Sequence, residues 1–203
     1  MKPLKNLFSR RYAALFITAS LSLLPALARD KDNALPNFQK VNGQIYRGAQ
    51  PDQDGFERLA KMGIRTIVDL QEFDGRARSE ERLVSSLGMR YINIPMRGME
   101  VPSDAAVQRA IAIMNDSSSG PVFVHCHRGA DRTGMVVACY RIQHDGWERK
   151  KALKEASKYG MSWYQFPLKA YVLRYSPSLD RGVLDADANV PAGGHTVETP
   201  AAP

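Results

Sequence analysis

Residues 122–134 read VFVHCHRGADRTG, and this stretch predicts the change from a buried strand to a helix. The run 121–125 is apolar and rich in Val and Phe, as is typical of a strand inside a sheet. From Thr133 the apolar residues follow a helical spacing up to residue 144. In an open α/β sheet, ligand sites lie outside the carboxyl ends of the strands. We therefore expect the turn between Cys126 and Arg132 at the edge of a binding site.

Short β-rich runs and helical patterns alternate through the rest of the chain. The other expected strands are 44–47, 64–70 and 89–95. Three expected helices lie between the strands and start after Pro51-Asp52, at Ser79 and after Ser103. Three more follow the last strand and cover 133–144, 148–158 and 167–175. We interpret Ser79 as a helix N-cap, with Glu80 and Glu81 complementing the positive end of the helix dipole. Alternation of this kind predicts an α/β fold: a small, mainly parallel sheet of four to five strands with helices on both faces.

The first 28 residues have the layout of an export signal. A basic start precedes an apolar run over 12–24, and small residues at Ala26 and Ala28 predict cleavage after Ala28. An uncleaved membrane anchor is the alternative, although the run is shorter than the ~20 residues that a spanning helix needs. Arg10-Arg11 also admits the twin-arginine route. We expect an exported protein, periplasmic or secreted, with no membrane span after cleavage.

Composition narrows the function classes. The hydrophobic share of 44% and the charged share of 24% exclude a disordered chain and a multispan membrane protein. The net charge is +7, and removing the four basic residues of segment 1–28, which has no acid, leaves +3. We therefore expect no nucleic-acid partner. We divide the chain into the signal, a lead-in over 29–42, one domain over 43–175 and a disordered tail over 176–203, rich in Pro, Ala and Gly.

The loop that begins at Cys126 has the composition of an anion site. Backbone N–H groups at a helix N-terminus would stabilise a thiolate and bind a tetrahedral dianion such as phosphate. Gly129 would permit a close approach or unusual backbone angles. Arg132 could hold two phosphate oxygens with its planar guanidinium, and the hydroxyl of Thr133 could hydrogen-bond the sulfur.

His125, Cys126, Arg132 and Thr133 match the signature H-C-x₅-R-[ST] of the cysteine-dependent protein tyrosine phosphatase superfamily. The chain resembles the compact, dual-specificity-like branch. Residues 46–51, YRGAQP, also resemble a Y-R-x-x-Q-P element found early in atypical bacterial, plant and fungal members. The resemblance covers residues 43 to 175, and its implied fold is that of a dual-specificity phosphatase.

The resemblance implies hydrolysis of a phosphomonoester through a cysteinyl-phosphate formed on Cys126. Arg132 would hold the phosphoryl oxygens together with the loop amides, and His125 would order the loop or pack in the core. The implied phosphate-binding loop consists of His127, Arg128, Gly129, Ala130 and Asp131. It implies no cofactor and no metal ion. The substrate would be a phosphoprotein or a small phosphorylated ligand such as an inositol phosphate, and we expect a monomer.

The general acid has two candidates, Asp131 inside the loop and Asp104 after the third strand-like run. Asp104 follows Ser103 at a helix start, so it could instead simply complement the helix dipole. Glu100, in the same segment, could be a solvated surface residue. Substrate-pocket candidates are Arg47 and Arg97, with Arg76 and Arg78 as further basic residues on neighbouring loops.

Two other functions fit parts of the pattern. A non-catalytic phosphate-binding module, a pseudophosphatase, would use the same loop without turnover. A rhodanese-like sulfurtransferase also has a Cys between strand and helix, but its loop needs no Arg followed by Thr. We interpret Cys139 as a small buried hydrophobe, and Trp147 and Trp163-Tyr164 as core or helix-junction packing.

Overall fold

The computed structural model describes residues 34–177. The predicted signal over 1–28, residues 29–33 of the lead-in and the predicted tail from 178 onward lie outside the described residues. The described fold begins ahead of Gly43, since Ala34 and Leu35 are buried and a short strand precedes that glycine.

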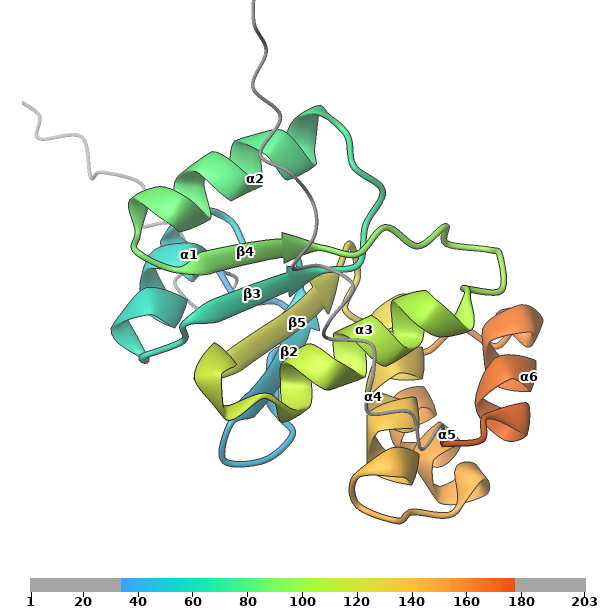
Figure 1. Ribbon diagram of the computed structural model, residues 1–203. Coiled ribbons are helices and arrows are strands. Elements are labelled where there is room, and N and C mark those ends of the chain that lie inside the picture. Colours follow the sequence, from blue (N-terminus) through green and yellow to red (C-terminus); the bar gives the residue numbers. More distant parts are fainter. Residues whose placement is uncertain (1–33, 178–203) are drawn as a thin grey trace, which may run out of the picture.

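A five-stranded sheet forms the centre of the fold (Figure 1), in the order β1-β2-β5-β3-β4. Its strands are β1 (Gln39–Lys40), β2 (Ile45–Ala49), β3 (Thr66–Asp69), β4 (Arg90–Asn93) and β5 (Val122–Cys126). Only β1 runs antiparallel to its neighbour, and the other pairs are parallel. This confirms the predicted α/β fold. The sequence did not predict β1, because a two-residue strand leaves no periodic pattern.

Six helices follow or separate the strands. They are α1 (Gln53–Lys61), α2 (Gly75–Ser86), α3 (Asp104–Asn115), α4 (Asp131–Gln143), α5 (Arg149–Lys158) and α6 (Phe166–Arg174), with a 3₁₀ turn at Ser117–Ser119. Ser103 caps α3 as predicted. The prediction for Ser79 was wrong, because Asp74 caps α2 and Ser79 lies inside the helix, donating to the carbonyl of Gly75. An aspartate accepts the N-terminal N–H groups of a helix as well as a serine does.

The helices cover both faces of the sheet (Figure 1). Ile67 and Phe123 pack on the face with α1 and α2, whereas Val68 and Val124, one residue further along, pack on the face with α3 to α6. Successive side chains of a strand point to opposite faces, so two adjacent apolar residues supply both cores. Within residues 34–177, no helix combines the length and the apolar character needed to cross a bilayer.

Of the residues that we interpreted as packing, Cys139 and Trp147 pack against the core, whereas Trp163 and Tyr164 do not. Cys139 is fully buried and unbridged, as predicted, and burial raises the pKa of its thiol. Trp147 packs partly buried against the core. The prediction for Trp163 and Tyr164 was wrong, because Trp163 is 76% exposed and Tyr164 is 42% exposed. In the loop between α5 and α6, Met161, Ser162 and Gln165 are buried instead.

Candidate active site

The predicted loop connects the end of β5 to the start of α4. Cys126 is the last residue of the strand and is 2% exposed, and Arg132 lies in the first turn of the helix. Gly129 adopts a φ of +64° between them. A Cβ there would lie 2.2 Å from the carbonyl carbon and oxygen of Gly48, so only glycine fits where the loop crosses the end of β2.

Three consecutive carbonyls, at residues 127–129, point out of the loop. The backbone N–H of Gln50 donates to the first at 3.3 Å, Asn37 Nδ2 to the second and third at 3.3 and 3.1 Å, and Arg47 Nη2 to the third at 2.6 Å. In a planar trans peptide the N–H points opposite to the carbonyl. The N–H groups of residues 128–130 therefore face the concave side of the loop, where an anion would lie.

Arg132 is held in place by main-chain oxygens of two other loops. Its Nη1 donates to the carbonyl of Leu70 at 3.3 Å and to that of Met96 at 3.0 Å. These loops follow β3 and β4, so three parallel strands contribute to the guanidinium's position. Arg132 lines a cavity of about 590 Å³, together with Gln71, Glu72, Phe73, Asp74, Arg76, Gly98 and His127.

Thr133 follows the arginine on α4 and is fully buried. Its hydroxyl has no hydrogen-bond partner within the described residues. An unpaired buried hydroxyl is costly, so this group is suited to hydrogen-bond a group that enters the site.

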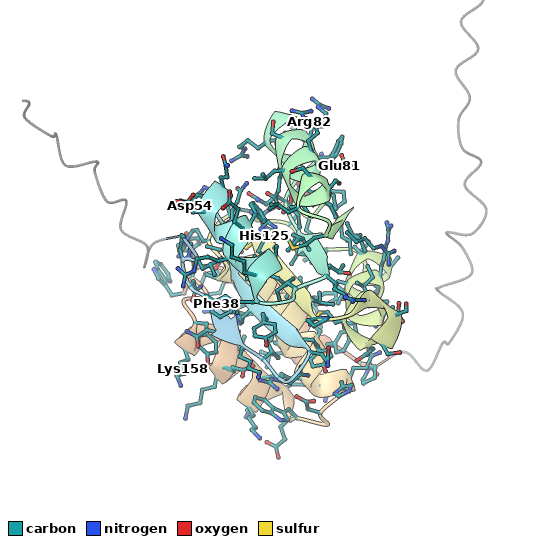
Figure 2. The ribbon with its side chains drawn as sticks, turned by 90° about the vertical axis from the view of Figure 1, so that its left-hand side faces the viewer. Phe38, Asp54, Glu81, Arg82, His125 and Lys158 are labelled. Carbon is teal, nitrogen blue, oxygen red and sulfur yellow. The ribbon has the colours of Figure 1, made fainter. Side chains whose placement is uncertain are left out.

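His125 lies in the middle of the fold, as Figure 2 shows, and is fully buried. Its Nε2 is 2.7 Å from Glu80 Oε1, and its Nδ1 is 4.0 Å from Asp69 Oδ1. Burial alone would lower the pKa of His125, but the charges of Glu80 and Asp69 outweigh burial, so the pKa is raised. The histidine is thus both a core residue and one half of a buried ion pair, directly before Cys126 in the chain.

A chain of side-chain hydrogen bonds connects this ion pair to the cavity. Glu80 Oε2 accepts from Gln50 Nε2 at 2.9 Å, and Gln50 Oε1 accepts from Gln71 Nε2 at 3.1 Å. Gln50 is the glutamine of the YRGAQP element, and Gln71 lines the cavity. Our interpretation of Glu80 as a residue that complements the dipole at the start of α2 was wrong. It shares the buried face of α2 with Ala77 and Val84, three and four residues away.

The two candidate substrate-pocket arginines, Arg47 and Arg97, lie outside the cavity lining. Arg47 is 1% exposed and lies behind the loop, where its guanidinium also packs over the ring of Tyr159. Burial lowers its pKa to about 10. Arg97 is exposed and pairs with Glu100 at 3.0 Å and with Glu72 at 3.6 Å.

The two candidate acids lie in different places. Asp131 Oδ1 accepts from the backbone N–H of Ser162 at 2.7 Å, which ties the loop between α5 and α6 to the phosphate-binding loop. Asp104 Oδ1 accepts from the hydroxyl of Tyr171 at 2.7 Å, in a separate cavity of about 570 Å³ between α3 and α6. Neither carboxylate lines the cavity that contains Arg132.

Two other acids do line that cavity, Glu72 and Asp74, and sequence reasoning missed both. They follow β3, which is the direct neighbour of β5, whereas Asp104 and Glu100 follow the more distant β4. Asp74 is engaged as the cap of α2, and hydrogen bonds from the N–H of Ala77 and from the side chain of Arg76 lower its pKa. The order of the strands in the sheet would have pointed to these two acids, but this order differs from the order of the strands in the sequence.

Comparisons with known proteins agree with this geometry. A family model described as a DSP-PTPase phosphatase fused to NAD+ kinase matches residues 26–172. The dual specificity protein phosphatase TpbA of Pseudomonas aeruginosa strain UCBPP-PA14 is 27% identical over 136 residues, 67% of this chain and 60% of that protein. The inositol diphosphatase DSP5 of Arabidopsis thaliana is 30% identical over 142 residues, covering 66% of this chain and 67% of the relative.

Solved structures show the same fold. The crystal structure of P. aeruginosa TpbA superposes with a TM-score of 0.60 at 25% identity, covering 70% of this chain and 86% of the other. The catalytic domain of the PP-IP phosphatase SIW14 of S. cerevisiae gives a TM-score of 0.62 at 23% identity, covering 76% and 93%. The chain spans less than two thirds of the two TpbA sequences, 60% and 57%. The matched family model, the loop and the fold together place the chain in the DSP-PTPase family, the dual-specificity branch of the cysteine-dependent protein tyrosine phosphatases.

Proposed function

We propose that this protein is a phosphomonoester hydrolase that works through a cysteinyl-phosphate intermediate. The observation that carries the proposal is the loop itself. Its N–H groups at residues 128–130 face inward, and Arg132 is fixed beside them by the carbonyls of Leu70 and Met96. Donors arranged in advance around one anion stabilise the charge that develops on a phosphoryl group in the transition state.

In the first step, Cys126 Sγ attacks phosphorus, and the bond from phosphorus to the leaving oxygen breaks. An acid donates a proton to that oxygen, so the product leaves as an alcohol or phenol. In the second step, water attacks phosphorus while the carboxylate that acted as acid takes a proton from it, the sulfur–phosphorus bond breaks, and the thiolate and inorganic phosphate are released. Arg132 and the loop amides hold the phosphoryl oxygens in both steps.

Asp131 and Asp104 stay our candidates for the acid, and we add Glu72 because it lines the cavity. Converting each of these three acids to its amide, one at a time, distinguishes the candidates. The variant that lacks the acid should lose far more activity on phenyl phosphate, whose phenolate is a poor leaving group, than on p-nitrophenyl phosphate. Equal losses on the two substrates would argue against that residue.

The substrate class follows from the relatives. TpbA is named a dual specificity protein phosphatase and has been crystallised with pTyr, and DSP5 is named an inositol diphosphatase. We propose a phosphoprotein or a small phosphorylated ligand for this chain.

A pseudophosphatase that binds phosphate without turnover is the second candidate. It is favoured by one observation: neither predicted acid is among the residues that line the cavity. It is disfavoured by the presence of both Cys126 and Arg132.

Hydrolysis of p-nitrophenyl phosphate by the full chain, under reducing conditions and with a chelator, tests the proposal. Cys126→Ser should abolish turnover, whereas Cys139→Ala, a change at the other cysteine, should leave kcat within a few fold. Equal activity in the wild type and Cys126→Ser would refute the mechanism. Phosphate binding without turnover in the wild type would favour the pseudophosphatase.

We also propose that the protein is exported and that segment 1–28 is removed. N-terminal sequencing of the protein recovered from a cell envelope fraction tests this. An N-terminus at Arg29 is expected, and an intact Met1 would contradict cleavage.

A further inference from the structure

Three aromatic side chains, two in the loop after α5 and one at the start of α6, are unusually exposed. Trp163 is 76% exposed, Tyr164 42% and Phe166 64%. The ring of Trp163 meets those of Tyr164 and Phe166 edge to face, with centroids 5.8 and 6.3 Å apart. We call these three residues the aromatic ledge. Contiguous exposed apolar surface of this kind commonly marks an interaction site.

The ledge adjoins residues that are hydrogen-bonded to loops of the active site. Ser162, on one side of it, donates from its N–H to Asp131 of the phosphate-binding loop and from its hydroxyl to the same carboxylate. Gln165, within it, is buried and donates from Nε2 to the carbonyl of Gly98 at 2.9 Å and to Met99 Sδ at 3.3 Å. Asp131 adjoins Arg132, and Gly98 lines the same cavity as Arg132. The segment that carries the ledge is thus hydrogen-bonded both to the phosphate-binding loop and to the loop after β4.

Further apolar side chains continue the surface around the cavity. Met99, in contact with Gln165, is 58% exposed, and Phe73, on the cavity lining, is 52% exposed. The mouth therefore has large apolar groups on the sides formed by the loops after β3, after β4 and between α5 and α6.

Two of the arginines near the cavity, Arg76 and Arg97, are already paired with acids. Arg76 pairs with Asp74 at 2.9 Å, and Arg97 pairs with both Glu100 and Glu72. Since each of these arginines already has a carboxylate partner, a second phosphate would have to displace an acid to gain a cation. One phosphate on an apolar or aromatic body fits this mouth better.

We propose that the aromatic ledge and Met99 bind the apolar residues that flank the phosphorylated residue of a polypeptide substrate. This inference rests on the proposed function and names the substrate class of the same site. The occupant is a polypeptide because the apolar surface includes Phe73 on the cavity lining but continues to Met99 and the ledge outside that lining, so a ligand that contacts all of it must extend beyond the phosphorylated side chain. Exposed aromatic anchors contribute much of the affinity of such interfaces.

The test compares Trp163→Ala and Phe166→Ala with the wild type on three substrates. They are a phosphotyrosyl peptide with Leu and Phe on both sides of the phosphorylated residue, the same peptide with Ser and Gly there, and p-nitrophenyl phosphate. We expect kcat/KM to fall about 10-fold for the apolar peptide and less than about twofold for the other two substrates. Met62→Ala is the matched control, since Met62 is 46% exposed but lies after α1, ahead of the amino end of β3.

Several outcomes would overturn the inference. An equal loss on all three substrates would show that the ledge supports the site instead of binding its ligand. Equal wild-type kcat/KM for the two peptides would show that no apolar docking takes place. Loss of binding to anionic phospholipid vesicles in the ledge variants, with unchanged peptide kinetics, would assign the ledge to a lipid surface.

Failure of the proposed function gives a different result. In that case the wild type turns over none of the three substrates. The ledge is then tested by titrating both peptides into Cys126→Ser and into Cys126→Ser with Trp163→Ala. A roughly 10-fold weaker Kd for the apolar peptide in the second protein supports docking, and equal Kd values overturn it.

Discussion

Replacing Gly129 by alanine perturbs the contact between the phosphate-binding loop and β2. Gly129 has a φ of +64°, and an alanine Cβ would lie 2.2 Å from the carbonyl group of Gly48 and 2.3 Å from the nitrogen of Ala49. A carbon–carbon contact is comfortable at about 3.5 Å, so the loop and β2 must separate by more than ~1 Å. The atoms that must move are backbone atoms, which have no alternative rotamer.

Two costs add up in this variant. Left-handed backbone costs an alanine about 1–2 kcal/mol, and overpacking costs about 1–3 kcal/mol. The free energy of unfolding should therefore fall by about 2–5 kcal/mol. A displacement near 1 Å at the catalytic loop can also cost about 10²-fold in rate, so kcat should fall by about that factor.

Gly63→Ala separates the two costs. Gly63 has a φ of +82°, and nothing lies within 4 Å of a Cβ built there. This variant carries the backbone strain without the clash, so it should lose only about 1–2 kcal/mol and keep its activity. Urea unfolding and p-nitrophenyl phosphate turnover, measured on both variants, give the comparison. Equal destabilisation with unchanged kcat in Gly129→Ala would refute the close approach of the loop to β2.

Three further variants test other contacts of the site. Arg132→Lys keeps the charge but cannot reach the carbonyls of Leu70 and Met96 while gripping two phosphate oxygens, so kcat/KM for p-nitrophenyl phosphate should fall at least ~10²-fold, and a loss under tenfold would contradict this. Glu80→Gln removes the buried partner of His125. Because that partner raises the pKa of His125, the ion pair stabilises the fold below the ordinary pKa, and its contribution is lost as the pH rises through the folded-state value. Urea unfolding between about pH 5 and pH 8 should show the variant losing most stability at the acidic end, and a loss that does not vary with pH would contradict the ion pair. Asp131→Asn weakens a charge-assisted bond to Ser162, so thermal unfolding should report a loss of about 1–3 kcal/mol, and an unchanged Tm would argue against this tether.

The sequence alone was sufficient for the fold class and for the loop. Buried parallel strands require apolar runs, and a loop that cradles an anion requires glycine and arginine at fixed offsets, so both leave local patterns. Val122 to Gly134 contains such a pattern within 13 contiguous residues, and the structure places its strand, loop and helix accordingly. The roles of Ser103 as a helix cap and of Cys139 as a buried hydrophobic residue could also be predicted from the neighbouring residues in the sequence.

Only the tertiary structure decided which side chains surround the loop. Glu80 and Glu81 are adjacent acids on α2, yet Glu80 is buried against His125. Glu81 is exposed and is labelled on the outside of the molecule in Figure 2. Arg47 supports the loop from behind, although its position in the chain suggested a substrate contact. The outcome at such positions depends on helix phase and on strand order, which brings β3 beside β5 and Glu72 to the cavity. Contacts between residues distant in the chain leave no periodic pattern in it, because the composition of each segment reflects only its own burial.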